Sequence, residues 1–248
     1  MSMSRQAWPY PSRWAHRGAG KLAPENTLAA IRHGASLGYR MFEFDVKLSA
    51  DGTLILMHDP MVDRTTDGRG RVAGLSLGEL SRLDAGGWHS AAHAGEGIPT
   101  LARVARWLRA NACLANIEIK PCPGREAETG AAAALEARAL WADAEVGPLL
   151  SSFSEVALAA AARAAPNLPR ALLLDEMPPD WADRAAALGC VAIDVNHHRL
   201  DAALIAEAHR LGLKVFSYTV NDPQRAALLF EWGLDALITD AVDLISPD

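Results

Sequence analysis

Carboxylate and imidazole side chains stand at a few positions of this sequence where their neighbours are strongly apolar. The stretch 41–59 reads MFEFDVKLSADGTLILMHD, with Glu43 and Asp45 two residues apart and His58 near its end. In an extended strand, residues two apart point to the same face, so both carboxylates lie opposite the apolar side chains. Two buried carboxylates on one face are costly unless a cation lies between them.

The second half of this stretch predicts a hairpin. Residues 49–52, Ser-Ala-Asp-Gly, are typical of a turn, because Asp-Gly tolerates positive φ. If Leu48 and Thr53 flank the turn, the returning strand carries His58 to a point roughly opposite Glu43. The hairpin would then bring two carboxylates and an imidazole into one small volume, as half of an active site requires.

Two other apolar segments also end in charged residues. His16 and Arg17 follow one of them, while Glu118 and Lys120, again two apart, end the other. Any one Glu in a strand is as often a salt-bridged structural residue as a ligand. Three carboxylates on neighbouring strands, without a cluster of cysteines or histidines, favour a hard divalent cation, Mg²⁺ or Ca²⁺.

The imidazole and basic residues suit chemistry on an anionic ester. His16 and His58 each end a strand near the predicted metal, and a pair of imidazoles suits general acid–base catalysis at neutral pH. Arg17 and Lys120 add the positive charge that holds an anionic phosphoryl group. The residues alone therefore predict a metal-assisted hydrolase with two catalytic histidines. We interpret the other six histidines as ordinary polar residues.

Short apolar strands that alternate with amphipathic helices must position these residues. This pattern predicts a parallel sheet covered by helices, and eight strands in 248 residues favour a closed (β/α)8 TIM barrel. No GxGxxG motif follows the first strand, which weakens the alternative of an open doubly wound sheet. Barrel enzymes carry their catalytic groups at the carboxyl ends of the strands. The expected strands are 13–18, 40–48, 113–120, 149–153, 171–175, 191–195, 214–220 and 236–240.

Residues from about 60 to 98 interrupt this alternation. They are rich in Gly, Asp and Thr, and carry one short helix for which Ser76 and Glu79 form a capping box. The stretch is too long for an ordinary connection and is expected to cover something. We interpret it as a small subdomain inserted after the second-strand hairpin, within one barrel domain that spans residues 1–248.

Composition bounds the partners and the compartment. The chain is 50% hydrophobic and 22% charged with a net charge of −6, which predicts no nucleic-acid partner. No stretch approaches the roughly 20 apolar residues of a membrane span, and residues 1–14 lack the apolar core of a signal peptide. Three widely spaced cysteines indicate reduced thiols. A cytoplasmic protein is expected, and its oligomeric state stays unknown.

Taken together, the motifs resemble those of the glycerophosphodiester phosphodiesterases, in particular the bacterial cytosolic UgpQ type. The similarity runs through essentially the whole chain, from Trp8 to Asp240, and rests on the order and spacing of motifs that are individually weak. These motifs are His16-Arg17-Gly18, Pro24-Glu25-Asn26-Thr27, Glu43-Phe44-Asp45, His58-Asp59, Glu118-Ile119-Lys120 and Tyr218-Thr219-Val220-Asn221.

The resemblance implies a (β/α)8 barrel with an insertion after the His-Asp motif. It also implies hydrolysis of glycerophosphodiesters, such as glycerophosphocholine and glycerophosphoethanolamine, to glycerol 3-phosphate and an alcohol. In such enzymes a glycerol hydroxyl attacks phosphorus, and water then opens the cyclic phosphate. The implied roles are metal ligation for Glu43, Asp45 and Glu118, phosphate contacts for Arg17 and Lys120, and acid–base catalysis for His58 (first base) and His16 (first acid).

Several alternatives stay open. Phe153 and Tyr218 lie at later strand ends, where they either wall the glycerol or alcohol pocket or simply pack at the rim. A related phosphodiesterase could act on lysophospholipids or other bulky diesters, which would favour an apolar rim. A non-catalytic, metal-dependent binding barrel would not need both His16 and His58. An amidohydrolase-type barrel would need a His-x-His after the first strand, which this sequence lacks.

Overall fold

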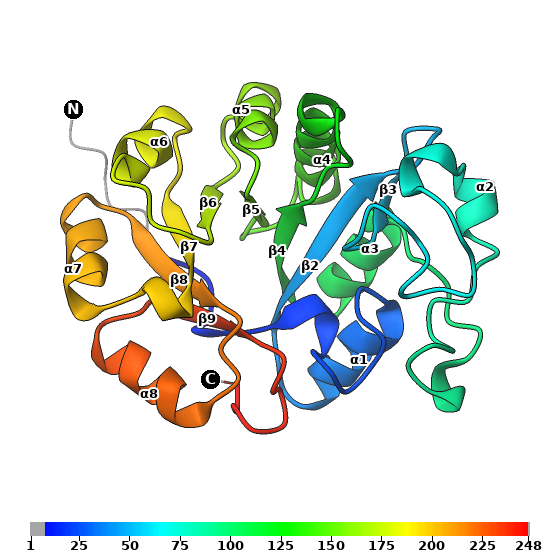
Figure 1. The fold of residues 1–248 in the computed structure, drawn as a ribbon, viewed down its shortest axis with the longest axis horizontal. Coiled ribbons are helices and arrows are strands. Elements are labelled where there is room, and N and C mark those ends of the chain that lie inside the picture. Colours follow the sequence, from blue (N-terminus) through cyan, green and yellow to red (C-terminus); the bar gives the residue numbers. More distant parts are fainter. Residues whose placement is uncertain (1–7, 248) are drawn as a thin grey trace.

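A ring of parallel strands surrounded by helices forms the centre of the computed structural model, which describes residues 8–247 (Figure 1). Of the nine strands in this part of the chain, only β3 (Leu54–Leu56) pairs antiparallel. Pairing of the first strand with the second closes the ring, so the predicted (β/α)8 barrel is confirmed. The barrel strands are β1 (Arg13–Ala15), β2 (Met41–Leu48), β4 (Leu114–Ile119), β5 (Leu149–Ser152), β6 (Arg170–Leu174), β7 (Ala192–Asn196), β8 (Lys214–Tyr218) and β9 (Ala236–Thr239).

Helices cover the outside of the ring between successive strands (Figure 1). Thr27, Thr100, Ser154 and Asp201 fix four helix starts, because each side chain accepts a hydrogen bond from the amide three residues later. No described helix has the length and apolar character that crossing a bilayer requires. The helices are α1 (Leu28–Ser36), α3 (Leu101–Ala110), α4 (Glu126–Leu140), α5 (Glu155–Ala164), α6 (Trp181–Ala187), α7 (Ala202–Arg210) and α8 (Pro223–Glu231).

Aromatic side chains close the amino end of the barrel. The rings of Trp14 on β1 and Phe216 on β8 lie 4.5 Å apart between centroids, and Trp14 is fully buried. Tyr10 and Trp8 pack against them from the segment before β1. Residues 1–7, part of the stretch in which no signal peptide is expected, lie outside the described residues. Because this end is filled, the carboxyl ends of the strands are left for a site.

Strand β2 divides its side chains as the alternation predicts. Phe42, Phe44 and Val46 join the main hydrophobic cluster beneath the helices. Glu43 and Asp45 lie on the opposite face, inside the barrel, with exposed fractions of 1% and 0%. The sequence pattern therefore places two carboxylates in the barrel without breaking the packing outside it.

The hairpin forms, but its predicted register is wrong by one residue. Leu48 pairs with Leu54 instead of Thr53, and this register extended would place His58 opposite Phe44. The cause is Ser49, which accepts the Thr53 amide on Oγ at 2.9 Å while its own amide donates to the Thr53 carbonyl. This arrangement widens the turn to five residues. His58 lies beyond the end of β3 and still lines the same cavity as Glu43.

The segment after the hairpin has a small core of its own. Ile55, Met57, Val62, Val72 and Leu80 belong to a hydrophobic cluster separate from that of the barrel. The predicted capping box is present and starts its short helix, α2 (Leu77–Leu80). These contacts support the proposal of a subdomain inserted at about 60–98 within one barrel domain.

This segment also packs against the loop that joins β1 to α1. Glu96 Oε1 accepts the Ala29 amide at 3.2 Å, where a carboxylate stabilises the start of α1. His89 Nε2 lies 3.0 Å from the Lys21 carbonyl oxygen. The segment therefore holds in place the first loop, which carries Arg17.

Candidate active site

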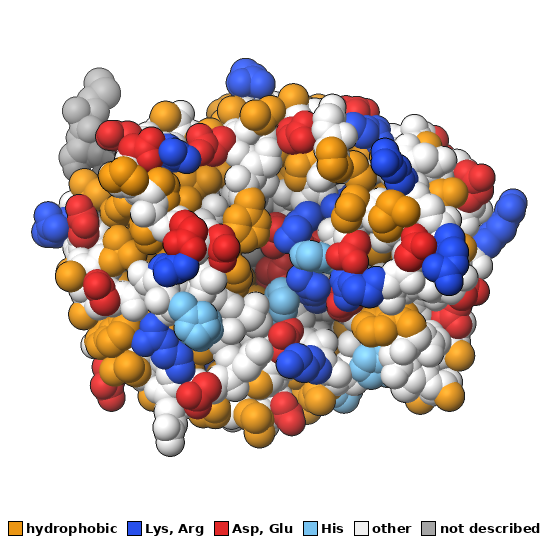
Figure 2. Space-filling model, in the orientation of Figure 1, with side chains coloured by type: hydrophobic (Ala, Val, Ile, Leu, Met, Phe, Trp, Pro, Cys, Tyr) orange, Lys and Arg blue, Asp and Glu red, His pale blue; other side chains and the backbone are white. Residues whose placement is uncertain are grey.

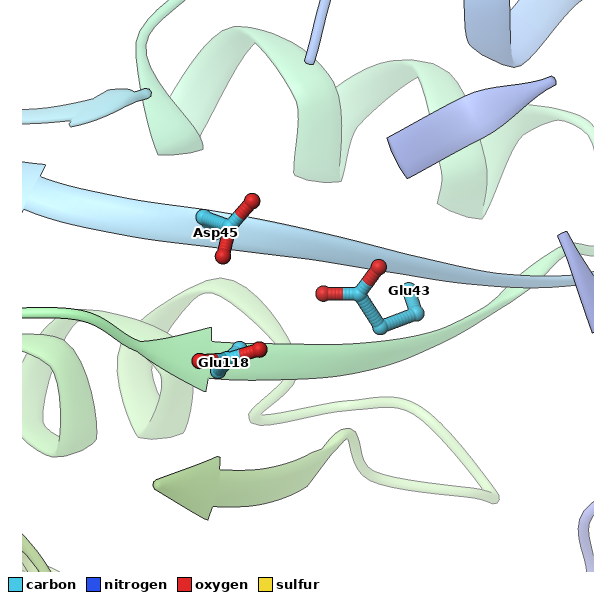
Figure 3. A group of neighbouring side chains, drawn as sticks. All are labelled: Glu43, Asp45 and Glu118. Atoms are coloured by element: carbon cyan, nitrogen blue, oxygen red, sulfur yellow. The ribbon is translucent and has the colours of Figure 1, made fainter. Parts of the chain in front are cut away.

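Three buried carboxylates meet between β2 and β4 near the carboxyl end of the barrel (Figure 3). Glu43 and Asp45 extend from β2 and Glu118 from β4, and one oxygen of each lies within 4.8 Å of the others. The pairing register sets Asp45 directly beside Glu118. Oε1 of Glu43 and Oδ1 of Asp45 are buried and have no hydrogen-bond partner. The structure thus brings together the three ligands predicted from the sequence.

The three carboxylates of this triad are buried and repel one another. Burial, followed by the charges of Asp45 and Glu118, raises the pKa of Glu43 well above its ordinary value. Burial and Asp45 likewise raise the pKa of Glu118. Burial would also raise the pKa of Asp45, but Arg17 and Lys120 hold it below the usual range.

These features fit a divalent cation. Repelling carboxylates with orphaned oxygens gain most from a positive ion placed between them. A donor set made only of carboxylate oxygens is the kind that Mg²⁺ and Ca²⁺ take, and no Cys or His completes it. The cluster of Glu43, Asp45 and Glu118 could therefore hold such an ion.

Two cations border the triad. Arg17 Nε lies 3.3 Å from Asp45 Oδ2 and its Nη1 lies 2.9 Å from Glu25 Oε1. The Arg17 amide donates to Glu43 Oε2 at 3.0 Å from a backbone with a φ of 49°, in the left-handed region that L-residues rarely adopt. Lys120 Nζ lies 2.8 Å from Glu118 Oε1. Positive charge is thus available on both sides of the carboxylates.

His16 is fixed by a carboxylate from the last barrel strand's end. Its Nδ1 lies 2.6 Å from Asp240 Oδ1, and because an ionised carboxylate only accepts, Nδ1 carries the proton. The His16 Nε2 points the other way and lies 3.7 Å from Glu43 Oε2. Asn221 Oδ1 accepts the Asp240 amide at 2.8 Å and steadies the pair.

His58 has a matching arrangement at the opposite edge. Its Nδ1 lies 2.6 Å from Asp59 Oδ1, and Arg64 Nε donates to Asp59 Oδ2 at 2.6 Å. The hydrogen bond from Arg64, and then that from His58, lowers the pKa of Asp59 to about 2 although burial would raise it, so this carboxylate is ionised at neutral pH. Arg64 also binds Glu25, which ties the His58 loop to the loop that carries Arg17.

The wall across the cavity comes from β5 to β8. The rings of Phe153 and Tyr218 meet edge to face with centroids 5.6 Å apart. Asp194 on β7 is fully buried, and both of its carboxylate oxygens lack a hydrogen-bond partner. Burial, followed by Glu118, raises the pKa of Asp194 well above its ordinary value.

One cavity of about 300 Å³ joins these groups, and its mouth appears as the hollow in Figure 2. Of the nine site residues predicted from the sequence, eight line it, and Asp45 lies beside Glu43 and Glu118. Sequence reasoning missed Asp240, Asp59 as the partner of His58, and Asn26. The Asn26 Nδ2 donates to Asp45 Oδ2 at 2.8 Å. The only sequence signal for Asn26 was its place in the Pro24–Thr27 motif.

Paired histidines, an acidic triad and flanking cations at the carboxyl-end rim of a TIM barrel define a barrel hydrolase. Comparison with known proteins makes the class more specific. The profile of the family described as "Glycerophosphoryl diester phosphodiesterase family" matches residues 16–244. The chain belongs to this family, and it is accordingly an enzyme, a phosphoric diester hydrolase.

Individual relatives agree along nearly the whole chain. A "Glycerophosphodiester phosphodiesterase" of Caldanaerobacter subterraneus is 34% identical over 227 residues, which cover 91% of this chain and 92% of that protein. An Oleispira antarctica phosphodiesterase, solved in complex with the product sn-glycerol-3-phosphate, has a TM-score of 0.88 at 34% identity and 93% coverage of each chain. An Agrobacterium tumefaciens glycerophosphodiester phosphodiesterase has a TM-score of 0.81 at 30% identity, covering 96% of this chain and 99% of that one.

Proposed function

We propose that this enzyme hydrolyses glycerophosphodiesters such as glycerophosphocholine and glycerophosphoethanolamine to glycerol 3-phosphate and an alcohol, by metal-dependent histidine catalysis. The observation that carries the proposal is the pair of histidines, each of which lies with Nδ1 at 2.6 Å from a carboxylate oxygen. Both histidines line the same cavity as Glu43 and Glu118 of the acidic triad. The product found in the Oleispira antarctica relative supports glycerol 3-phosphate as the shared part of the substrates.

Glu43, Asp45 and Glu118 would hold Mg²⁺ or Ca²⁺. When bound, such an ion polarises phosphoryl oxygens and lowers the pKa of a hydroxyl group beside it. Arg17 and Lys120 line the same cavity, and would bind the phosphate oxygens through charge-assisted hydrogen bonds. Both cations lie beside the carboxylates in the structure.

The two histidines would divide the proton transfers of the first step. Burial lowers the pKa of His58, so its Nε2 is available as a base at neutral pH. It would take the proton of the glycerol hydroxyl as that oxygen attacks phosphorus and a cyclic phosphate forms. His16, which the Asp240 carboxylate holds through Nδ1, would give a proton from Nε2 to the departing alcohol oxygen.

The roles would then reverse. Neutral His16 takes a proton from water as the water oxygen attacks the cyclic phosphate. Protonated His58 returns its proton to the glycerol oxygen as the P–O bond of the ring breaks. Glycerol 3-phosphate leaves, and both histidines regain their starting protonation states.

The test is a coupled assay for glycerol 3-phosphate released from glycerophosphocholine. We expect release with Mg²⁺ or Ca²⁺, none with EDTA, and a loss of at least about 10²-fold in kcat for His16→Ala and His58→Ala. Full activity in either histidine variant or in Glu43→Ala would overturn the site assignment. Unchanged activity in EDTA would overturn the metal dependence alone.

The cavity lining also bears on the choice between small diesters and lysophospholipids. Among its lining residues, the aliphatic and Phe side chains are limited to Phe153, Leu173 and Ile238, and the others are polar or charged. A lipid tail would need a larger apolar surface, so water-soluble diesters are favoured. A water-soluble substrate supports a cytoplasmic location for the enzyme, and so do its three buried cysteines, none of which forms a disulfide.

A further inference from the structure

The two sides of the active-site cavity carry different chemistry. Arg17, Lys120 and both histidines lie on the side of β1, β2 and β4, where the phosphate would bind. On the side of β5 to β8, the charged groups that line the cavity are Asp175 and Asp194, both acidic. Figure 2 shows acidic side chains gathered at the rim over β6 and β7, facing basic and imidazole side chains across the hollow.

Asp194 supplies a strong, unused acceptor on this acidic side. Its side chain is fully buried on β7 and lines the cavity, yet neither carboxylate oxygen has a hydrogen-bond partner. A buried carboxyl group without a partner is costly, unless a ligand completes the site. Lys120 is not a hydrogen-bond partner of Asp194, because its Nζ already lies 2.8 Å from Glu118 Oε1 and 3.6 Å from Asp45 Oδ1.

Asp175 places a second acceptor closer to the mouth. Asn196 Nδ2 donates to Asp175 Oδ1 at 2.8 Å, which orients this exposed side chain. The neighbouring Glu176 differs, because it pairs with Arg199 and does not line the cavity. The carboxyl groups that this wall offers to a ligand are therefore Asp175 at the exposed mouth and the buried Asp194, whose ionised form burial disfavours until a cation lies beside it.

Two aromatic rings line the cavity together with these carboxylates, and Lys120 Nζ lies over one face of the Phe153 ring at 5.3 Å from its centroid. Phe153 is 43% exposed and meets Tyr218 edge to face, and both rings line the cavity. The face of an aromatic ring attracts an alkylammonium ion, and the attraction grows when the ion is partly desolvated. Aromatic rings beside carboxylates form the combination that recognises quaternary and primary ammonium groups.

We propose that this wall, composed of Phe153, Asp175, Asp194 and Tyr218, binds a positively charged ammonium group on the alcohol half of the substrate. The preferred substrates are then glycerophosphodiesters of amino alcohols, over those of neutral polyols. The inference rests on the proposed function, because the wall selects among diesters that the same site hydrolyses. Charge supports it, since an ammonium group complements the Asp175 carboxylate and would favour the ionised form of Asp194.

The experiment compares kcat/KM for glycerophosphocholine and glycerophosphoethanolamine with kcat/KM for glycerophosphoglycerol, whose alcohol half carries no charge. We expect the wild-type enzyme to prefer the two ammonium-bearing diesters by about tenfold or more. Asp194→Asn and Asp175→Asn should each lower this ratio several-fold, mainly through KM for the ammonium-bearing substrates. Glu176→Gln is the matched control, since it removes one negative charge from the same rim, outside the cavity, and should leave the ratio unchanged.

The outcomes separate this inference from the proposed function. Turnover of all three diesters, with a ratio that neither Asp variant alters, would overturn the ammonium site and leave the hydrolase assignment intact. If no diester is turned over, the proposed function fails. Calorimetric measurement of choline binding then still tests whether the wall binds an ammonium group. Choline binding that Asp175→Asn weakens supports the site, whereas no choline binding, or binding that this variant leaves unchanged, overturns it. Asp175 is exposed, so its variant folds even if Asp194→Asn does not.

Discussion

His16 and Asp240 show at the residue scale how the barrel fixes a proton on one ring nitrogen. We predict that Asp240→Asn lowers kcat by about 10²-fold to 10⁴-fold with little change in KM, because the ionised acceptor is lost and an amide that turns its NH2 group towards Nδ1 favours the wrong tautomer of His16. The measurement is steady-state kinetics on glycerophosphocholine across pH, in which the variant should also show an altered pH profile. An unchanged kcat would mean that Asp240 does not position His16.

The chain offers a matched control for this substitution. Asp235 makes a similar bond to His209, with Oδ2 2.8 Å from Nε2, on a part of the molecule away from the cavity. Asp235→Asn should leave kcat and KM at the wild-type values. A fall of kcat in both variants would indicate general damage to the fold instead of a role in catalysis.

The residues predicted from the sequence and those missed differ in how local their signal is. Glu43 with Asp45, and Glu118 with Lys120, stand two apart in apolar strands, so their shared face follows from local geometry. Asp240 lies 224 positions from His16, and their contact depends on closure of the barrel. Asp194 looks like one polar residue in a strand until its partnerless oxygens are seen. Pairings across the ring carry no periodic signature in the sequence.

The contact between α4 and α5 gives a prediction at the scale of elements. A Cβ added to Gly130 on α4 would lie 2.1 Å from the Ala157 carbonyl oxygen. Relieving this clash would require the backbone of α5 to move. Gly130→Ala should therefore lower the free energy of unfolding by about 1–3 kcal/mol, despite the better helix propensity of alanine. Urea unfolding measures this change.

Gly78→Ala is the control for that helix substitution. Gly78 lies in α2, and the nearest atom to an added Cβ is Ser76 Oγ at 3.9 Å. Its replacement should leave stability equal or raise it by up to about 1 kcal/mol, because only the helix propensity changes. If both variants lost the same stability, close packing of α4 on α5 would not be the cause.

Elements were predictable to the extent that their signals are local. The strands, the helices and the capping box of α2 follow from apolar periodicity and capping residues, and the closed ring follows from their number. The register of β2 on β3 did not, because the Ser49 side chain widens the turn by one residue. A side-chain hydrogen bond of this kind determines whether the turn has four or five residues. The Asp-Gly pair alone does not determine the length of the turn.

At the scale of the whole molecule, stability should depend on pH through His197. Burial, followed by His198 and Arg225, lowers the pKa of His197 to about 4. In the unfolded chain the His197 side chain has a pKa near 6.5, so between about pH 6.5 and about pH 4 it binds a proton that the folded protein does not bind. The stability that is present above about pH 6.5 is therefore lost as pH falls towards about 4. Allowing for solvent screening, we expect a loss of about 1 kcal/mol.

His197→Gln tests this dependence. Urea unfolding of the variant should show a smaller loss of stability between about pH 7 and about pH 4.5 than the wild-type protein does. The comparison is between slopes, so a constant difference in stability from the substitution does not affect it. Equal slopes in the two proteins would exclude His197 as a source of acid sensitivity.

The acidic triad should couple metal binding to the stability of the whole barrel. A ligand that binds only the folded state stabilises it by about 2.7 kcal/mol at a hundredfold excess over Kd. For a domain of this size, Mg²⁺ or Ca²⁺ should then raise the Tm by about 5–10 °C over the protein in EDTA. Differential scanning calorimetry measures this shift without reference to activity.

Glu43→Gln separates relief of repulsion from metal binding. Its amide oxygen can still accept the Arg17 amide, which lies 3.0 Å from Glu43 Oε2, so the local hydrogen bond is kept. Because Glu43 is buried beside Asp45 and Glu118, loss of its charge should leave the Tm in EDTA equal or higher than that of wild-type protein. The increase on adding the ion should largely disappear. A variant that kept the full wild-type increase would show that the cation binds elsewhere on the folded protein.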